Sequence, residues 1–120
     1  MPSPRVFGLE TEYGLSARTR PGSGSPWRRL TSDDAAQRLF APLAREHAST
    51  NLFLPNGGRL YLDVGNHPEY ATPECTTITD LQVAERAGDE LMVALASRAA
   101  EAEADEGRET EFALYKNNLD

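Results

Sequence analysis

The sequence predicts an α+β fold in which a largely antiparallel sheet packs against helices. Three observations predict it: short β-rich runs, two helical stretches that each carry an apolar stripe, and the order strand, helix, hairpin, long helix, strand. A chain of 120 residues is long enough to bury one hydrophobic core. We therefore expect residues 1–120 to belong to one domain.

The first expected strand covers residues 6–15, which mix β-branched, aromatic and aliphatic side chains. Because strand side chains alternate between the two faces, Glu10 and Glu12 should project to the same side. Residues 18–29 are rich in Gly, Ser, Pro and Arg, a composition that predicts a surface loop without core residues.

A helix is expected after Thr31, which resembles an N-cap because Asp34 follows three positions later. Apolar residues then recur at helical spacing: Ala35, Ala36, Leu39, Phe40 and Leu43. Proline lacks a backbone N–H, so we expect this helix to be strained or to end near Pro42.

A hairpin is predicted from two strand-like runs, residues 52–54 and 59–64, joined by Pro-Asn-Gly-Gly. The pair Asn56-Gly57 should supply the positive φ angles of a tight turn. Alternation along the second strand separates an apolar face from a polar one. The apolar face holds Leu60, Leu62 and Val64, and the polar face holds Arg59, Tyr61 and Asp63.

A long helix is expected to begin at Thr79, which forms a capping-box pattern with Gln82. One apolar stripe follows it: Leu81, Ala84, Gly88, Leu91, Met92, Leu95 and Ala99. Gly107 is a plausible stop for the helix, and residues 110–115 return to strand character.

Composition excludes several classes of protein. A net charge of −7 argues against nucleic acid as a partner, because binders of the phosphate backbone are usually basic. No apolar run approaches the roughly 20 residues that span a bilayer, and the first residues do not resemble a signal peptide. Cys75, the single cysteine, is expected to be a small buried residue rather than a nucleophile. A reducing cytoplasm fits best.

Four carboxylates are expected on neighbouring strands of the polar face: Glu10, Glu12, Asp63 and Glu69. They would repel one another unless a cation lay between them, and ligation by oxygen alone favours magnesium over zinc. The alternative is a solvated strand face with weak ion pairs, and the residue pattern leaves both open. His67 precedes a proline, so a role in the turn or in supporting a ligand is preferred to ligation.

Three blocks of sequence carry a resemblance to a known family: residues 8–14 (GLETEYG), residues 56–75 (NGGRLYLDVGNHPEYATPEC) and residues 115–118 (YKNN). Together they resemble the Pup ligase and Pup deamidase family. The resemblance implies a glutamine-synthetase-like carboxylate-amine ligase fold, with ATP and Mg²⁺ held on a curved, largely antiparallel sheet. It also implies roles for single residues: Mg²⁺ contacts for Glu10, Tyr61 and Glu69, ATP contacts for Arg59 and Thr72, and the catalytic carboxylate for Asp63.

By this resemblance the chain is the amino-terminal part of a catalytic ligase domain, and the rest of that domain and a carboxy-terminal domain are absent. The implied reaction joins the carboxy-terminal glutamate of Pup to lysines of target proteins through a glutamyl phosphate, which marks the targets for proteasomal degradation. The chain alone is expected to be inactive. A long insertion typical of the deamidase branch is missing, which favours a ligase. A Pup deamidase or depupylase, a noncatalytic truncated remnant, and a related ligase for small amines stay open.

Overall fold

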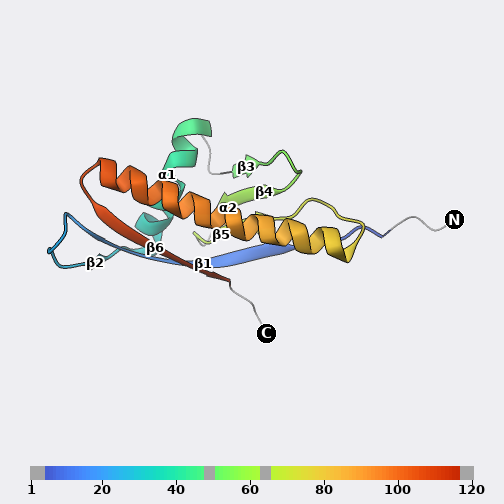
Figure 1. Cartoon of the computed structure of the whole chain (residues 1–120), viewed down its shortest axis with the longest axis horizontal. Helices are drawn as coiled ribbons and strands as arrows, with labels where there is room; N and C mark the ends of the chain where they lie inside the picture. The colour runs from blue at the N-terminus through green and yellow to red at the C-terminus, as the bar shows by residue number, and fades with distance from the viewer. Residues whose placement is uncertain (1–4, 48–50, 63–65, 117–120) are drawn as a thin grey trace.

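The structure is a computed structural model that describes residues 5–47, 51–62 and 66–116 (Figure 1). It confirms an α+β fold in which the paired strands are all antiparallel. In chain order the elements are β1 (Glu10–Arg20), β2 (Arg28–Arg29), α1 (Ser32–His47), β3 (Asn51–Phe53), β4 (Arg59–Leu62), β5 (Pro68–Ala71), α2 (Ile78–Asp105) and β6 (Glu109–Lys116).

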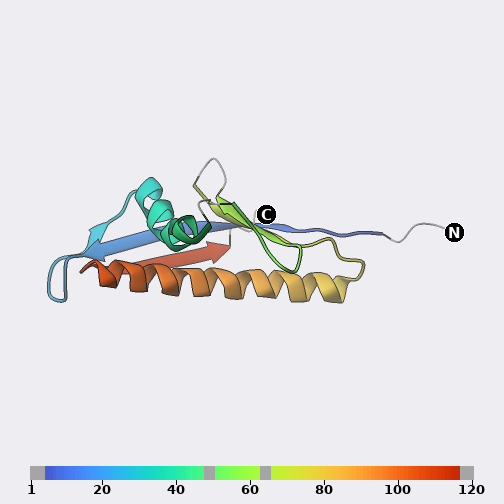
Figure 2. The same cartoon turned by 90° about the horizontal axis from the view of Figure 1, so that it is seen from above.

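The sheet is organised around β1, which pairs with three other strands. The strand order is β2-β1-β5-β4-β3, and β6 pairs with β1 outside this path. Residues 10–12 of β1 pair with β5, whereas residues 13–20 pair with β6. Helix α2 runs along the length of β6 (Figure 2), so the two carboxy-terminal elements enclose one side of the core.

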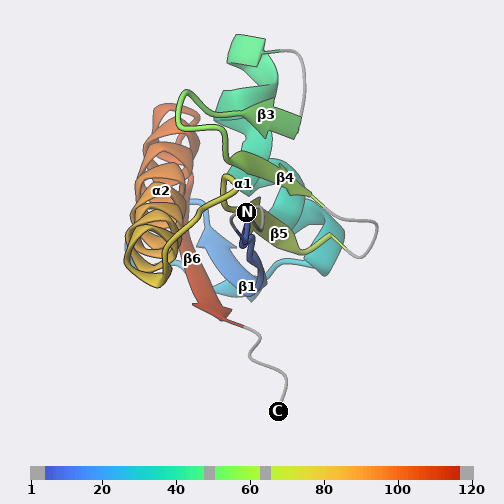
Figure 3. The same cartoon turned by 90° about the vertical axis from the view of Figure 1, so that its right-hand side faces the viewer.

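The hydrophobic core lies between one face of the sheet and both helices (Figure 3). Tyr13 and Ala17, at odd positions of β1, are buried on this face. The core residues are Tyr13, Leu39, Phe40, Leu43, Leu60, Tyr70, Met92, Leu95 and Ala99. Tyr70 packs so closely on α2 that a Cβ added at Gly88 would lie 2.2 Å from its ring. The glycine is therefore part of the packing.

The opposite side of the sheet, here called the open face, carries the even positions of β1 and the side chains aligned with them. Its members on β1 are Glu10, Glu12, Gly14, Ser16, Arg18 and Arg20, and on the other strands they include Asn51, Phe53, Arg59, Tyr61, Glu69, Ala71, Glu111, Ala113 and Tyr115. Glu10 and Glu12 thus share one face, as alternation predicts. Phe53 is 73% exposed and Tyr115 is 57% exposed, so the described part leaves this face uncovered.

The first strand begins later and ends later than predicted. A strand was expected over residues 6–15 and a loop over residues 18–29. β1 begins at Glu10 and continues to Arg20, because β6 pairs with it as far as Glu109. Thr19 is only 4% exposed, so the segment contributes to the interior after all. Only residues 21–27 are irregular, and Arg28–Arg29 forms β2. Long-range pairing with β6 overrides the local loop composition.

The first helix is confirmed, but the expectation that it ends near Pro42 is wrong. The Thr31 hydroxyl accepts a hydrogen bond from the Asp34 backbone N–H at 3.1 Å, which is the predicted N-cap. The helix continues through Pro42 to His47. Proline removes one backbone donor, and burial of Leu39 and Leu43 against the sheet outweighs that loss.

The hairpin between β3 and β4 is confirmed, with a correction to its turn. Asn56 does not take a positive φ; in this turn only Gly57 does, at 88°. The Gly57 N–H donates to the Leu54 carbonyl at 2.9 Å, which places Pro55 at the second position of the turn. Proline is preferred there because its ring fixes φ.

The N-cap of the long helix lies two residues before the predicted one, and α2 begins at Ile78. The Thr77 hydroxyl, not that of Thr79, caps it by accepting from the Asp80 N–H at 3.0 Å. The predicted apolar stripe is confirmed, with Ala84, Met92, Leu95 and Ala99 buried. Gly107 ends the helix as expected.

At Gly107 φ is +81°, and the next residue, Arg108, donates its N–H to the Glu103 carbonyl at 2.9 Å. This is the pattern of a glycine-terminated helix. Cys75 is 7% exposed and donates its thiol to the Pro73 carbonyl, which confirms the prediction of a small buried residue. None of the helices in the described ranges has the length and apolar character needed to cross a membrane.

Candidate active site

Three side chains form a row across the open face on neighbouring strands. Glu12 on β1 lies directly opposite Glu69 on β5, and Glu69 lies opposite Tyr61 on β4. The Tyr61 hydroxyl donates a hydrogen bond to Oε2 of Glu69. The structure therefore brings together two of the three residues expected to bind Mg²⁺.

Glu10, the third expected ligand, lies beside this row. Glu10 aligns with Ala71, two residues along β5 from Glu69 and on the same face. Burial, the hydrogen bond to Glu69 and the negative charges of Glu69 and Glu10 raise the pKa of Tyr61 to about 12. With this pKa the phenol stays neutral at physiological pH and acts as a hydrogen-bond donor.

Arg59 occupies the adjacent row and is held by aromatic rings. Its guanidinium lies 4.0 Å from the centroid of the Tyr61 ring and 5.7 Å from that of Phe53. Its Nε donates to Oδ1 of Asn51 at 2.8 Å. Across the sheet Arg59 aligns with Ala71, which aligns in turn with Glu10. The small Ala71 side chain leaves room above the sheet between an arginine and a carboxylate.

Thr72, expected to contact ATP, follows β5 directly. Its hydroxyl accepts a hydrogen bond from the Leu9 N–H at 2.9 Å, and its own N–H donates to the Leu9 carbonyl at 2.9 Å. These two bonds fix the start of β1 against the end of β5. The Thr72 hydroxyl keeps its proton for donation to a ligand.

His67 contacts Glu12, with Nδ1 lying 2.7 Å from Oε1 of the carboxylate. The imidazole thus supports an acidic residue of the row. Asp63, expected to be the catalytic carboxylate, lies outside the described residues, and its role stays a prediction.

The donors of this face suit Mg²⁺ in chemistry. Glu10, Glu69 and Tyr61 offer only oxygen atoms, which hard divalent cations prefer. Glu12 and Glu69 are directly opposed carboxylates, an arrangement that destabilises a sheet unless a positive charge compensates it. Within residues 5–47, 51–62 and 66–116, no three His, Cys, Asp or Glu side chains by themselves form a metal-binding group.

Sequence reasoning missed a polar network that fixes β1 from the core side. The Tyr13 hydroxyl donates to Oδ1 of Asp89 at 2.5 Å, and Lys116 Nζ lies 2.9 Å from Oδ2 of the same carboxylate. Lys116 also pairs with Glu85 at 3.1 Å. These residues are far apart in sequence, so no local pattern indicates the contacts. The network joins β1, α2 and β6 beneath the open face.

Fold and site together define an α+β protein in which helices cover one face of an antiparallel sheet and the other face gathers carboxylates, a phenol and a guanidinium. The family model described as "Pup-ligase protein" matches residues 5–120, and the chain belongs to this family. The resemblance noted from the three sequence blocks is confirmed.

Relatives agree with the family. The chain is 50% identical over 116 residues to a Pup--protein ligase of Corynebacterium diphtheriae, covering 97% of this chain and 23% of that protein. It is 47% identical over 116 residues to one from Kocuria rhizophila, covering 97% of this chain and 24% of that protein. The chain thus spans about a quarter of the length of these relatives.

Two solved structures are also similar. The complex between the prokaryotic ubiquitin-like protein Pup and its ligase PafA matches with a TM-score of 0.81 and 44% identity, over 98% of this chain and 22% of that one. The Pup ligase PafA in complex with ADP matches with a TM-score of 0.54 and 44% identity, over 82% of this chain and 21% of that one.

Proposed function

We propose that this chain forms part of the catalytic sheet of an ATP-dependent ligase that joins the carboxy-terminal glutamate of Pup to lysines of target proteins. The observation that carries the proposal is the row on the open face, where Tyr61 contacts Glu69 and Glu10 acts on the same phenol. Identity of 44–50% to proteins named as Pup--protein ligases, or as the ligase PafA bound to Pup, supports it. Modification of cytoplasmic targets for degradation by the proteasome belongs to the same proposal.

The open face carries side chains that would bind Mg²⁺ and the nucleotide. Glu10, Tyr61 and Glu69 would hold Mg²⁺, which when bound offsets the negative charge of the transferring phosphoryl group. Tyr61 would contribute its phenol oxygen, which already lies against the Glu69 carboxylate. A similar ligase was solved in complex with ADP, which supports nucleotide binding by the protein of which this chain forms part.

Arg59 is suited to hold phosphate oxygens of ATP. Its stacking on Tyr61 and its Nε bond to Asn51 restrict the guanidinium before a ligand arrives. The terminal nitrogens remain available as paired donors, which match phosphate and carboxylate oxygens. Thr72 adds a hydroxyl donor one residue beyond β5. The protein therefore orients the nucleotide with groups that need little reordering.

The reaction requires two steps. An oxygen of the glutamate γ-carboxylate attacks the γ-phosphorus of ATP, and the bond between that phosphorus and the β,γ-bridging oxygen breaks. ADP is released, and the glutamate carries an acyl phosphate. The lysine amine then attacks the acyl carbon, inorganic phosphate departs with the bonding electrons, and an isopeptide bond forms. The attacking nitrogen loses one proton, which Asp63 would accept as a general base.

The test is a chimera in which this chain replaces the matched 116-residue segment of the Corynebacterium diphtheriae ligase. With Pup, ATP, Mg²⁺ and a lysine-bearing protein, the chimera should produce an acceptor enlarged by the mass of Pup. The chain by itself serves as the control and should give no conjugate. A folded chimera that only removes Pup from conjugates would identify a depupylase. Turnover with free amines alone would indicate a small-molecule ligase, and no turnover would support a noncatalytic remnant.

A further inference from the structure

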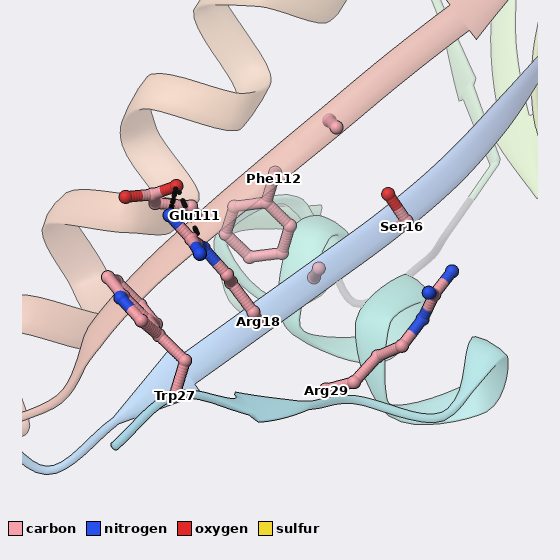
Figure 4. A pocket seen from close by; sticks show the side chains of 8 residues that line it. Ser16, Arg18, Trp27, Arg29, Glu111 and Phe112 are labelled. Atoms are coloured by element: carbon pink, nitrogen blue, oxygen red, sulfur yellow. Dashed lines mark hydrogen bonds and ion pairs between the residues drawn. The ribbon is translucent and has the colours of Figure 1, made fainter. Parts of the chain in front are cut away.

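A hollow lies on the open face, at the end of β1 opposite to Glu10. It has a volume of about 460 Å³ and its lining includes Ser16, Arg18, Trp27, Arg29, Glu111 and Phe112. Figure 4 shows Trp27 and the Arg18–Glu111 pair on one side of it and Arg29 and Ser16 on the other. Nothing in the proposed chemistry at Glu10, Tyr61 and Glu69 uses this pocket.

Charged side chains hold the wall formed by Trp27. Two guanidinium groups lie over the indole, that of Arg18 at 4.2 Å and that of Arg20 at 4.1 Å from a ring centroid. Both arginines are fixed in turn by carboxylates on β6, with Arg18 lying 2.9 Å from Glu111 and Arg20 lying 2.9 Å from Glu109. An apolar surface is therefore held in place beside charged groups.

Arg18 and Arg29 line the pocket, and Arg29 is the pocket arginine that is not paired with a carboxylate in the described part of the chain. It lies opposite Arg18 in the pairing of β1 and β2, so it shares the open face. Among the described residues, no carboxylate pairs with its guanidinium. In a chain of net charge −7, this is a local cationic site facing solvent.

We propose that this pocket binds the side-chain carboxylate of an extended acidic peptide. The Arg29 guanidinium presents paired N–H donors that match two carboxylate oxygens, and the Ser16 hydroxyl lies on the same side. The Trp27 face suits the methylene groups of a glutamate. That this peptide is a segment of Pup or of the acceptor protein rests on the proposed function.

Placement along β1 favours a peptide over a nucleotide. Arg18 follows Glu12 by six residues, which corresponds to about 20 Å in a β-strand. ATP is already provided for at Arg59 and Thr72, beside the acidic end of the face. A peptide whose reacting group lies at Glu12, Glu69 and Tyr61 could therefore place an acidic residue in the pocket about six positions away.

A binding experiment can use Trp27, the single tryptophan of the chain, as its probe. The chain is titrated with a hexapeptide of glutamate and, at equal ionic strength, with a hexapeptide of glutamine, while tryptophan fluorescence is recorded. The glutamate peptide should change the fluorescence saturably and the glutamine peptide should not. Arg29→Gln should weaken binding about ten-fold, because a charge-assisted hydrogen bond is lost.

Arg28→Gln is the matched control. Arg28 precedes Arg29 on β2 but aligns with Thr19, whose side chain lies on the core side of β1, and it does not line the pocket. The variant removes the same charge from the same strand and should bind the glutamate peptide like the unaltered chain. Equal loss in both variants, no difference between the two peptides, or Arg29-dependent binding of inorganic phosphate without peptide binding would each overturn the proposal.

The link to a substrate is tested in the chimera. There, Arg29→Gln should raise the KM of one protein substrate about ten-fold with an unchanged kcat, whereas Arg28→Gln should leave both constants unchanged. A raised KM for Pup identifies Pup as the source of the carboxylate, and a raised KM for the acceptor identifies the acceptor. Unchanged KM values for both would refute the substrate assignment. The fluorescence titration requires no turnover, so its outcome is independent of the proposed function.

Discussion

Tyr61 and Glu69 face each other on β4 and β5, and the Tyr61 hydroxyl donates to Oε2 of the Glu69 carboxylate. On its other side Glu69 faces Glu12 of β1. A carboxylate between a neutral phenol and a second carboxylate is an arrangement that a divalent cation would stabilise. The first prediction concerns that cation.

Glu10→Gln and Glu69→Gln, made separately in the chimera, should raise the Mg²⁺ concentration needed for half-maximal conjugation. An amide is a weaker ligand of a hard cation than a carboxylate. Conjugation rates over a Mg²⁺ titration measure the shift. Glu90→Gln, an exposed position on α2, is the control and should titrate like the unaltered chimera. If both site variants keep the original Mg²⁺ dependence, neither carboxylate binds the metal.

Ionisation of Tyr61 should lower the free energy of unfolding at alkaline pH. Its pKa is raised to about 12, so the proton is bound more tightly in the folded chain than in the unfolded one. The resulting stability is complete below pH 10, the ordinary pKa of tyrosine, and is lost as pH rises through about 12. Urea midpoints at pH 9 and 11.5 should therefore fall less in Tyr61→Phe than in the unaltered chain. An identical fall in both would contradict the raised pKa.

Protonation of Glu103 should lower the stability of the fold in acid. It is 5% exposed and accepts from Arg38 at 2.8 Å and from Thr110 at 2.9 Å. Burial opposes its ionisation, but hydrogen bonds from Arg108, Arg38 and Thr110 outweigh burial and lower the pKa to about 2. This stability is present above about pH 4.5 and is lost as pH falls through about 2.

Glu103→Gln should therefore cost about 3 kcal/mol at neutral pH, because two arginines lose their charged partner. It should also flatten the decline of stability between pH 4.5 and 2. Urea unfolding at several pH values measures both effects. Glu101→Gln on the same helix is exposed and should change stability by less than about 0.5 kcal/mol. Equal effects of the two substitutions would show that Glu103 does not determine the stability of the fold in acid.

Replacing Gly88 with alanine should destabilise the chain, although alanine has the higher helix propensity. Alanine normally stabilises a helix by about 1 kcal/mol relative to glycine. Here the added methyl group would meet the ring of Tyr70, which is 1% exposed and has no room to retreat. Gly88→Ala should destabilise the chain by about 1–3 kcal/mol. Ser97→Ala, exposed on the same helix, should be neutral or slightly stabilising. A more stable Gly88→Ala would show that α2 and β5 are loosely packed.

Periodicity was sufficient to predict both helices, the β3–β4 hairpin and the placement of Glu10 and Glu12 on one face. Those features depend on local spacing, which the sequence displays directly. The end of β1 at Arg20 was not predictable, because it depends on pairing with β6, about ninety residues away. The helix end expected near Pro42 was wrong for a similar reason, since tertiary packing decided it.

The candidate site was predicted in part. Strand parity indicated the polar face, and the family resemblance indicated which of its residues bind ligands. The contacts of Tyr61 with Glu69 and of His67 with Glu12 depend on the register between strands, which parity alone does not determine. The pocket at Trp27 was not predicted, because Arg18, Trp27 and Arg29 lie in a segment whose composition predicts only a loop and the rest of the lining comes from other segments.

The most direct test of the account is the rate of conjugate formation by the chimera with and without Asp63→Asn. Asparagine keeps the size of the side chain and removes its basicity, so the rate should fall roughly 100- to 10,000-fold. ATP binding and thermal stability should be retained, because the substitution leaves the core residue Leu60 of β4 unchanged and keeps the size of the side chain. A variant that binds ATP and conjugates Pup at a near-normal rate would contradict the assignment of Asp63 as the proton acceptor.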